Sequence, residues 1–273
     1  MQLGDSTQWR CNLAAQGAKL SACHAQSTRA ISICIMRTRV KICGMTRPED
    51  IAAAVEAGAD AVGLIFYPKS KRYVSLELAA RLRRAVPAFV DVVALFVNAD
   101  DDAVKQVIEV VGPDLLQFHG DETPDACQRY GRRYMKAFRV GGPGADTAGQ
   151  LARTCAAYRG AAGWLFDSYS AGYGGSGLSF EHALLQDVRA DSQGAPLILS
   201  GGLSPDNVQP AVAALRPYAV DVSSGVEDAP GIKSAARIRA FLQAVQRADA
   251  EVAKDLDDAA GVRMSPVTTP TGA

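Results

Sequence analysis

Eight short apolar runs alternate with helical patterns along most of this chain. The runs begin roughly every 26 residues, at Val40, Ala61, Val90, Leu115, Tyr134, Gly163, Pro196 and Ala219. Stretches rich in Ala, Val and Leu lie between them, as at residues 49–58, 75–85, 101–111 and 233–245. Strands that alternate with helices pair in parallel through right-handed crossovers. Eight such units predict an α/β fold, a single (β/α)8 TIM barrel with a parallel eight-stranded core. An open doubly wound sheet is the alternative, but no GxGxxG sequence follows the first run.

Two expected helix starts carry local signals. Thr46 and Glu49 have the spacing of a capping box around Pro48. Ser204 stands directly before Pro205, and that order places a capping hydroxyl ahead of a proline suited to the first helical turn.

Charge and cysteine content exclude several classes of protein. Lys and Arg number 29 and so do Asp and Glu, so the formal net charge is zero, which argues against nucleic acid or an anionic membrane as the main partner. No apolar run reaches the roughly 18 residues of a membrane-spanning helix. Six cysteines show no CxxC spacing and three histidines do not cluster with them, so we expect no metal site and no disulfide framework. Reduced thiols in a cytoplasmic enzyme are the simplest interpretation.

Both ends of the chain differ in composition from its body. Residues 1–38 are basic and rich in Ser, Thr, Gln and Ala. Three interpretations are open: a transit peptide, a disordered arm, or a start codon wrongly assigned upstream of the true one. We favour the last, because Met36 stands just before the first expected strand. Residues 249–273 are acidic and end in Pro, Thr and Gly, so we expect a frayed helix followed by disorder. The barrel itself is expected over residues 39–248.

Glycine and serine follow the last two expected strands. Gly201 and Gly202 end the seventh, and Ser223, Ser224 and Gly225 end the eighth. In barrels of this kind, function lies where strands end, and the seventh and eighth loops commonly hold phosphate. Glycines let backbone N–H groups surround such an anion. The alternative is a pair of tight turns; within a barrel we favour phosphate binding.

A thiol and a carboxylate end two other strands. Cys43 closes the first strand and Asp167 closes the sixth, so both should lie at one mouth. A thiolate can take a proton from carbon and a carboxylic acid can give one to oxygen, each worth about 10²–10⁴ in rate. A half-buried inert cysteine and a capping or ion-paired aspartate are the alternatives from position alone.

The thiol needs help to act as a base, because a free thiol titrates near pH ~8.5. Lys41 lies on the same side of the first strand as Cys43, since side chains alternate. Asp221 shares a face with Ser223 on the eighth strand, which neighbours the first in a closed barrel. We therefore expect Lys41 and Asp221 to form a buried ion pair beneath the thiol, holding Lys41 charged and favouring thiolate. The alternative is that one of the two points outward to a helix.

The loop after the second strand carries Lys69, Lys71 and Arg72. We interpret the two lysines as solvated. The guanidinium of Arg72 could bind a planar aryl carboxylate in two-pronged fashion. His119 ends the fourth strand and is expected to be a hydrogen-bonding wall residue of the mouth. The sixth loop is glycine-rich and could close as a lid; its glycines include Gly174, Gly175 and Gly177.

Together these segments resemble the phosphoribosylanthranilate isomerase family of tryptophan biosynthesis. The resemblance spans about residues 39–246 and is carried by KICG, the SKRY loop, LLQFHG, LFDSYSAGYGGSG, LILSGGL and DVSSGVE, in the family's order. It implies a barrel enzyme that performs an Amadori rearrangement, with Cys43 as base, Asp167 as acid and Arg72 at the anthranilate carboxylate. It implies no metal or organic cofactor, because the substrate's own iminium is the electron sink.

Two other functions are compatible with parts of the pattern. Another phosphate-handling barrel enzyme, such as an epimerase, a lyase or an indole-glycerol-phosphate-synthase-like protein, would share the phosphate loops but use different acid and base residues. A catalytically idle barrel would not need Cys43 and Asp167. We expect a small phosphorylated substrate, no nucleic acid or membrane partner, and a monomer, since no long exposed apolar stripe is evident.

Overall fold

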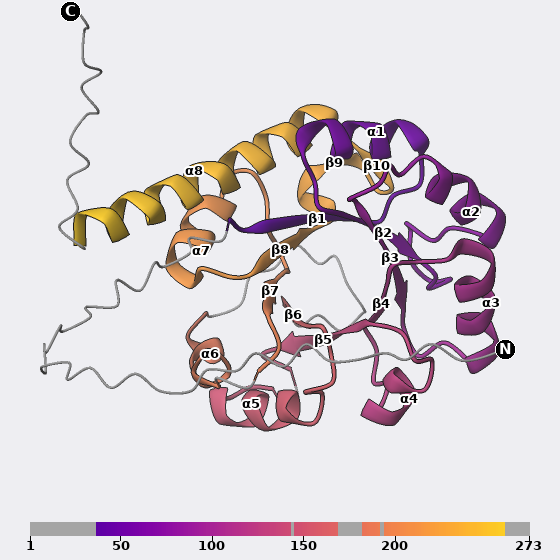
Figure 1. Ribbon diagram of the computed structural model, residues 1–273, viewed down its shortest axis with the longest axis horizontal. Helices are drawn as coiled ribbons and strands as arrows, with labels where there is room; N and C mark the ends of the chain where they lie inside the picture. The colour runs from indigo at the N-terminus through magenta and orange to yellow at the C-terminus, as the bar shows by residue number, and fades with distance from the viewer. Residues whose placement is uncertain (1–36, 143–144, 169–181, 192–193, 260–273) are drawn as a thin grey trace, which may run out of the picture. The chain divides into compact units, whose positions relative to one another are not determined.

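A computed structural model describes residues 37–142, 145–168, 182–191 and 194–259, and these form a closed barrel surrounded by helices (Figure 1). Each of eight strands pairs in parallel with the next, and β8 pairs with β1 to close the ring. The strands are β1 (Arg39–Cys43), β2 (Ala61–Ile65), β3 (Asp91–Phe96), β4 (Leu115–Phe118), β5 (Tyr134–Val140), β6 (Gly163–Ser168), β7 (Leu197–Leu199) and β8 (Ala219–Val222). The predicted (β/α)8 barrel is confirmed.

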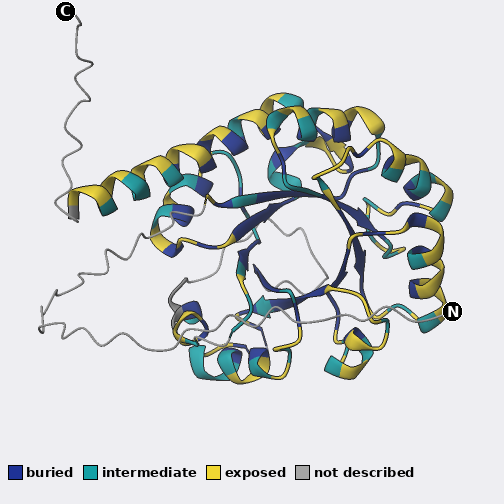
Figure 2. Ribbon diagram, viewed as in Figure 1, coloured by how far each residue is buried: buried dark blue, intermediate teal, exposed yellow. Residues whose placement is uncertain are grey.

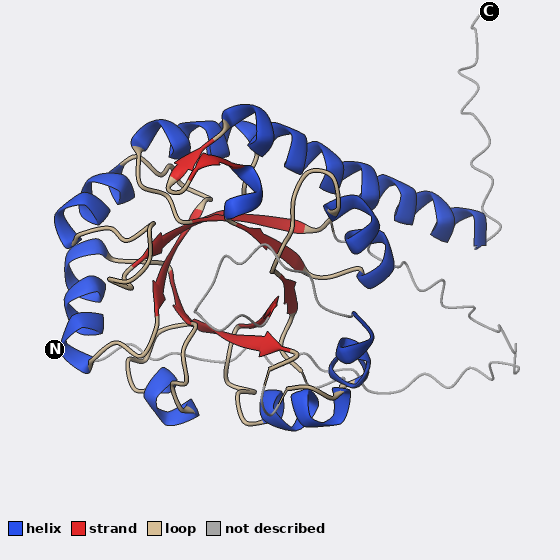
Figure 3. Cartoon of the chain, turned by 180° about the vertical axis from the view of Figure 1, so that it is seen from behind, coloured by secondary structure: helices blue, strands red, loops and turns tan. Residues whose placement is uncertain are grey.

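Helices follow the strands around the outside of this ring (Figure 3). They are α1 (Pro48–Ala57), α2 (Leu76–Arg84), α3 (Asp101–Val111), α4 (Pro124–Gln128), α5 (Ala148–Ala156), α6 (Gln186–Ala190), α7 (Val208–Leu215) and α8 (Ala235–Ala259). Short 3-10 helices, His182–Leu185 and Ser224–Val226, precede α6 and follow β8. None of the helices in the described ranges is long and apolar enough to cross a membrane.

Alternate residues of each strand face two separate cores. On β3, Val92, Ala94 and Phe96 pack into the large cluster shared with the helices, whereas Val93 and Leu95 belong to small clusters within the barrel. Figure 2 shows the result, with the strands of the barrel mostly buried and the helices buried mainly on their inner faces. Because this alternation also governs the polar residues, every second side chain near a strand's end lies inside the mouth of the barrel.

A two-stranded antiparallel hairpin follows β8, made of β9 (Glu227–Ala229) and β10 (Ile232–Lys233). The hairpin is fastened to the segment that joins β1 to α1. Thr46 donates its hydroxyl hydrogen bond to the carbonyl oxygen of Gly231, and the carboxylate of Asp50 accepts from the backbone N–H of Lys233 at 3.2 Å. The chain segment after β8 is thereby held against the segment after β1.

The two predicted helix caps have different outcomes. α1 begins at Pro48 without a side-chain cap, because the Thr46 hydroxyl bonds Gly231 instead, so that prediction is wrong. The Ser204 hydroxyl does accept from the N–H of Asp206, at 3.3 Å, but it caps a turn that precedes α7, which begins at Val208.

Helix α8 extends beyond the expected end of the barrel at residue 248. It continues to Ala259, and Asp249 accepts hydrogen bonds from the backbone N–H and the hydroxyl of Thr38, at 2.9 and 2.7 Å. Residues 1–36 and 260–273 lie outside the described residues, so the proposals for them stay predictions. Asp249 therefore connects the last helix to the start of the first strand.

Replacing Asp249 with Ala should destabilise the barrel, because Thr38 is buried and would lose both hydrogen-bond acceptors. We expect a loss of about 2 kcal/mol in the free energy of unfolding, or a melting temperature lower by about 4–8 °C. Asp255→Ala, at an exposed position of the same helix, is the matched control and should change it by less than about 0.5 kcal/mol. Equal melting temperatures for the two variants would contradict this role of Asp249.

Candidate active site

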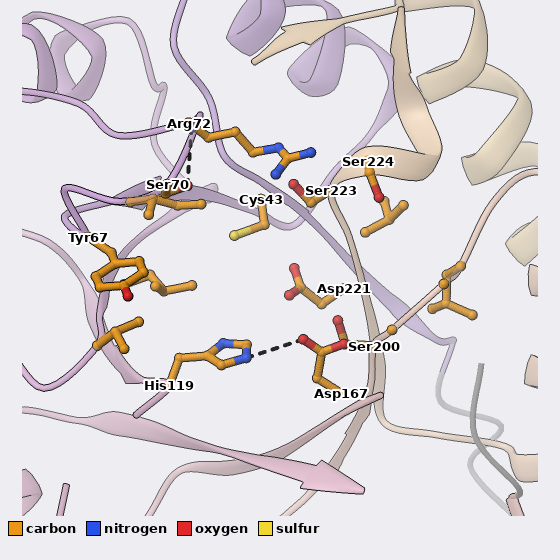
Figure 4. Close-up of a pocket in the computed structure, with 17 residues that line it drawn as sticks. Cys43, Tyr67, Ser70, Arg72, His119, Asp167, Ser200, Asp221, Ser223 and Ser224 are labelled. Carbon is orange, nitrogen blue, oxygen red and sulfur yellow. Dashed lines mark hydrogen bonds and ion pairs between the residues drawn. The ribbon is translucent and has the colours of Figure 1, made fainter. Parts of the chain in front are cut away.

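A cavity opens at the carboxyl ends of the strands. It encloses about 700 Å³, part of it open to solvent, and is lined by residues that end or follow β1, β2, β3, β4, β6, β7 and β8. Figure 4 shows the side chains of Cys43 and Asp167 entering this cavity from different elements, with Asp221 and His119 beside them. The structure thus brings together side chains that are far apart in the sequence.

Lys41 and Asp221 form an ion pair inside the barrel, next to Cys43. The Lys41 Nζ lies 2.8 Å from Oδ1 of Asp221, and each side chain is less than a tenth exposed. The two residues face each other directly in the pairing of β1 with β8. The predicted buried ion pair is therefore confirmed, and the alternative that one of its members points outward is excluded.

The ion pair opposes the effect of burial on the thiol. Burial raises the pKa of Cys43 above its ordinary value, Lys41 opposes the rise, and Asp221 adds to it. Burial alone would lower the pKa of Lys41, but Asp221 and Cys43 outweigh it and raise that pKa. Lys41 is thus held charged and favours the thiolate as predicted, but desolvation of the sulfur is the larger effect and leaves the pKa of Cys43 raised.

Gly63 provides the space that the thiol and the ammonium occupy. It pairs with Cys43 across β1 and β2. A side-chain carbon at this position would lie 2.7 Å from the sulfur of Cys43 and 3.2 Å from the Nζ of Lys41. Any larger residue would displace one of the two, so the absence of a side chain on β2 belongs to the site.

Asp167 is contacted from two sides. Its Oδ1 accepts from the backbone N–H of Ser168 at 2.9 Å, and its Oδ2 lies 3.2 Å from Nε2 of His119 without hydrogen-bond geometry. The other ring nitrogen of His119, Nδ1, lies 3.1 Å from the amide nitrogen of the buried Gln117. His119 is therefore a wall residue of the cavity, held by Gln117 and lying against Asp167.

The residues of the expected phosphate site meet on one side of the cavity. Gly201, Gly202, Ser223 and Ser224 line it, whereas Gly225 does not. The first two have positive φ angles of 83° and 67°, a backbone conformation that favours glycine. These four residues, called the glycine–serine cradle below, line the same cavity as Asp167 and Asp221.

Two of these glycines are required by close approach. A side-chain carbon at Gly201 would lie 2.5 Å from the backbone nitrogen of Ser168 and 2.7 Å from Oδ1 of Asp167. One at Gly225 would lie 1.9 Å from the carbonyl oxygen of Leu203. Gly225 therefore allows the loop after β8 to pack closely against the loop after β7, although Gly225 itself does not line the cavity.

Arg72 lines the cavity, but a protein carboxylate already holds one edge of its guanidinium. Nε and Nη2 donate to Oε1 and Oε2 of Glu227, at 2.7 Å each. Glu227 also pairs with the ammonium of Lys233, at 2.8 Å. Burial would raise the pKa of Glu227, but Arg72 and Lys233 outweigh it and lower that pKa. Sequence reasoning missed Glu227 as the partner of Arg72 and Lys233 as the second partner of Glu227, because their only signal was two charged residues in and after the expected eighth loop.

Some of the expected site residues lie outside the part of the chain that the structure describes. The proposed lid glycines Gly174, Gly175 and Gly177 lie outside the described residues. Within the described part of the chain, no group of three or more His, Cys, Asp and Glu side chains is arranged to hold a metal ion.

Alkylation of Cys43 tests the electrostatics of the site. Because the pKa of this thiol is raised, its thiolate fraction should be small at neutral pH, and the alkylation rate should still be rising above about pH 8.5. Lys41→Met removes the cation that opposes the rise, so the rate at pH 8 should fall several-fold. Lys136→Met, which removes another buried, ion-paired lysine, is the control. A rate that levels off below about pH 7, measured on the mapped Cys43 peptide, would contradict the raised pKa.

Comparisons with known proteins show the family of the chain. A family model described as N-(5'phosphoribosyl)anthranilate (PRA) isomerase matches residues 40–244. The chain is 67% identical over 214 residues to the N-(5'-phosphoribosyl)anthranilate isomerase of Bordetella petrii, covering 78% of this chain and 97% of that protein. It is 51% identical over 209 residues to the isomerase of Pseudomonas aeruginosa, covering 76% and 95%.

Solved structures give the same result. The phosphoribosyl anthranilate isomerase of Thermotoga maritima superimposes with a TM-score of 0.70 at 40% identity, covering 77% of this chain and 99% of that one. A phosphoribosyl anthranilate isomerase crystallised with reduced 1-(o-carboxyphenylamino)-1-deoxyribulose 5-phosphate gives 0.67 at 38% identity, with the same coverage. The chain belongs to the N-(5'-phosphoribosyl)anthranilate isomerase family.

Proposed function

We propose that this isomerase catalyses the Amadori rearrangement of N-(5-phosphoribosyl)anthranilate to 1-(2-carboxyphenylamino)-1-deoxyribulose 5-phosphate in tryptophan biosynthesis, with Asp167 as general acid and Cys43 as general base. The observation that carries the proposal is that a thiol and a carboxyl group line one cavity together with an arginine and a glycine–serine cradle. A family relative has been crystallised with a reduced form of this product, which supports a phosphorylated sugar in the cavity.

The acid step falls to Asp167. In its protonated form it donates to the ring oxygen of the furanose, and the ring opens as the C1–N bond becomes an iminium. The hydrogen bond from the backbone N–H of Ser168 directs the carboxyl group before the substrate arrives, and the ring of His119 lies against its other oxygen. A group held in this way spends no free energy on reorientation in the transition state.

The base step falls to Cys43. The iminium makes the neighbouring C2–H acidic, and the thiolate removes that proton to give an enolamine. The raised pKa of the free thiol suits this order of events, because a cation placed beside the sulfur favours its ionised form. Lys41, held charged by Asp221, gives the thiolate a second positive neighbour.

The protons balance over the whole reaction. Asp167 gives one proton to the ring oxygen, and Cys43 takes one from C2. The enolamine becomes the ketone when C1 gains a proton and the C2 hydroxyl loses one. No proton is consumed overall, and no metal or organic cofactor is needed because the iminium itself accepts the electron pair.

Two anchors hold the ends of the substrate in this proposal. The cradle of Gly201, Gly202, Ser223 and Ser224 takes the phosphate. Arg72 takes the anthranilate carboxylate with the guanidinium edge that Glu227 leaves free, since Glu227 occupies only Nε and Nη2. An arginine oriented by one carboxylate is already in place to bind a second.

Cys43→Ala and Asp167→Asn should each lower kcat by about 10²–10⁴ while the fold survives, because each removes one proton transfer. The measurement is the loss of substrate fluorescence, with circular dichroism as a check on folding. Cys127→Ala, at a buried cysteine of α4 that does not line the cavity, is the matched control and should keep its kcat. A folded Cys43 or Asp167 variant with near-normal turnover would refute the role assigned to that residue.

Arg72→Ala should raise KM by about 10- to 100-fold, since hydrogen bonds to a charged group contribute about 1.5–3 kcal/mol. Steady-state kinetics give KM and kcat separately. Lys71→Ala, the exposed neighbour, should change neither. Unchanged KM and kcat/KM in Arg72→Ala would show that the carboxylate binds elsewhere.

A further inference from the structure

Lys233 is a buried cation beside the cavity that the proposed mechanism does not use. It lies on β10, its side chain has no solvent exposure, and it is not among the residues that line the cavity. Its Nζ contacts Oε1 of Glu227 at 2.8 Å, the carbonyl oxygen of Ser223 at 3.1 Å and the hydroxyl of Ser223 at 3.4 Å. The ammonium group therefore contacts both Ser223, in the loop after β8, and Glu227, which binds Arg72.

Glu227 is the other half of this link. It is the acceptor for both Lys233 and Arg72, and its side chain is only 5% exposed. Both of its oxygens are engaged by Arg72, so the guanidinium cannot rotate without breaking two hydrogen bonds. One carboxylate between two cations leaves a net positive charge next to a site that is proposed to bind a substrate with two anionic ends.

The hairpin that carries both residues is itself fixed. Asp50 accepts from the backbone N–H of Lys233, and Arg47 both pairs with Asp50 and donates to the carbonyl oxygen of Lys233 at 3.4 Å. These residues open α1, a few positions after Cys43. The backbone of Lys233 is thus bonded to the start of α1, in the segment that follows the proposed base Cys43. These bonds hold the hairpin that carries Lys233 and Glu227.

We propose that Lys233 and Glu227 are positioning residues that hold the two substrate anchors in place, Lys233 for the phosphate and Glu227 for the carboxylate. The proposal rests on the function proposed above. Lys233 acts through the peptide between Ser223 and Ser224. Because that peptide is planar and trans, fixing the Ser223 carbonyl toward Lys233 turns the N–H of Ser224 the opposite way, and Ser224 lines the cavity. Glu227 acts by holding the Arg72 guanidinium.

The two halves predict different losses. Lys233→Met frees the Ser223–Ser224 peptide but leaves Glu227 bonded to Arg72, so phosphate binding should suffer most. Glu227→Gln weakens the hold on Arg72 but leaves the contact of Lys233 with Ser223, so carboxylate binding should suffer most. A purely structural role would weaken both ends alike.

The experiment measures kcat and KM for N-(5-phosphoribosyl)anthranilate and the inhibition constants of inorganic phosphate and of anthranilate. For Lys233→Met we expect the phosphate inhibition constant and KM to rise about tenfold, equal to about 1.4 kcal/mol, with a smaller change in kcat. For Glu227→Gln we expect the anthranilate constant to rise more than the phosphate constant. If Lys233→Met does not fold, the test is whether Glu227→Gln raises the anthranilate inhibition constant more than the phosphate inhibition constant.

Lys136→Met is the matched control. Lys136 is equally buried, pairs with Glu122 at 3.2 Å and donates to the carbonyl oxygen of Gly120 at 2.6 Å, but contacts neither Arg72 nor Ser223. It should lose thermal stability and keep the phosphate constant of the wild type. An unchanged phosphate constant in Lys233→Met, an equal rise in Lys136→Met, or equal losses at both ends in Glu227→Gln would each overturn the proposal.

Failure of the proposed function gives a different result. A wild-type protein that does not consume N-(5-phosphoribosyl)anthranilate refutes the function. Calorimetry with inorganic phosphate then still compares wild type with Lys233→Met, and weaker binding in the variant supports the positioning role. An active wild type whose binding constants do not respond to Lys233→Met refutes the positioning role and leaves the function standing.

Discussion

The pairing of β1 with β8 is the contact on which the site depends. It closes the barrel and joins residues about 180 positions apart, setting Lys41 directly opposite Asp221. Because all eight strands run the same way, closure also collects every strand's carboxyl end at one rim. The thiol of Cys43 on β1 is a neighbour of the loop after β8 through that closure, whereas Asp167 and the loops after β7 and β8 lie on consecutive strands. A barrel opened between β1 and β8 would separate Cys43 from the cradle after β8.

Charge around the cavity is arranged in layers. Lys41 and Asp221 neutralise each other at the bottom, whereas Arg72 and Lys233 exceed Glu227 by one positive charge at the side. Burial raises the pKa of the Cys43 thiol, and Lys41 opposes that rise. In the proposed reaction, the cationic intermediate adds a further positive charge that favours the thiolate.

Local pattern was enough to predict the strands and the residues at their ends. Side chains alternate along a strand, so Lys41 and Cys43 had to share the inner face, and strand order then placed Asp221 beside them. Patterns that depend on distant partners failed. The Thr46 hydroxyl bonds Gly231, 185 positions away, rather than its own helix. Glu227, the partner of Arg72, lies 155 positions away in the sequence. The desolvation of Cys43 depends on packing between several strands and loops, which a local sequence pattern does not reveal.

Lys233 and Glu227 show what such packing can add to a catalytic site. A buried Lys–Glu pair seldom stabilises a fold more than two apolar side chains of similar volume would, because desolvation offsets the attraction. Burial indeed lowers the pKa of Lys233 despite the carboxylate beside it. Stability alone therefore does not explain the pair. What apolar residues could not do is direct a carbonyl group and a guanidinium at the same time, and those are the two groups that Lys233 and Glu227 contact. The pair is best understood as a geometric constraint on the anchors, held in place by the attachment of its hairpin to α1.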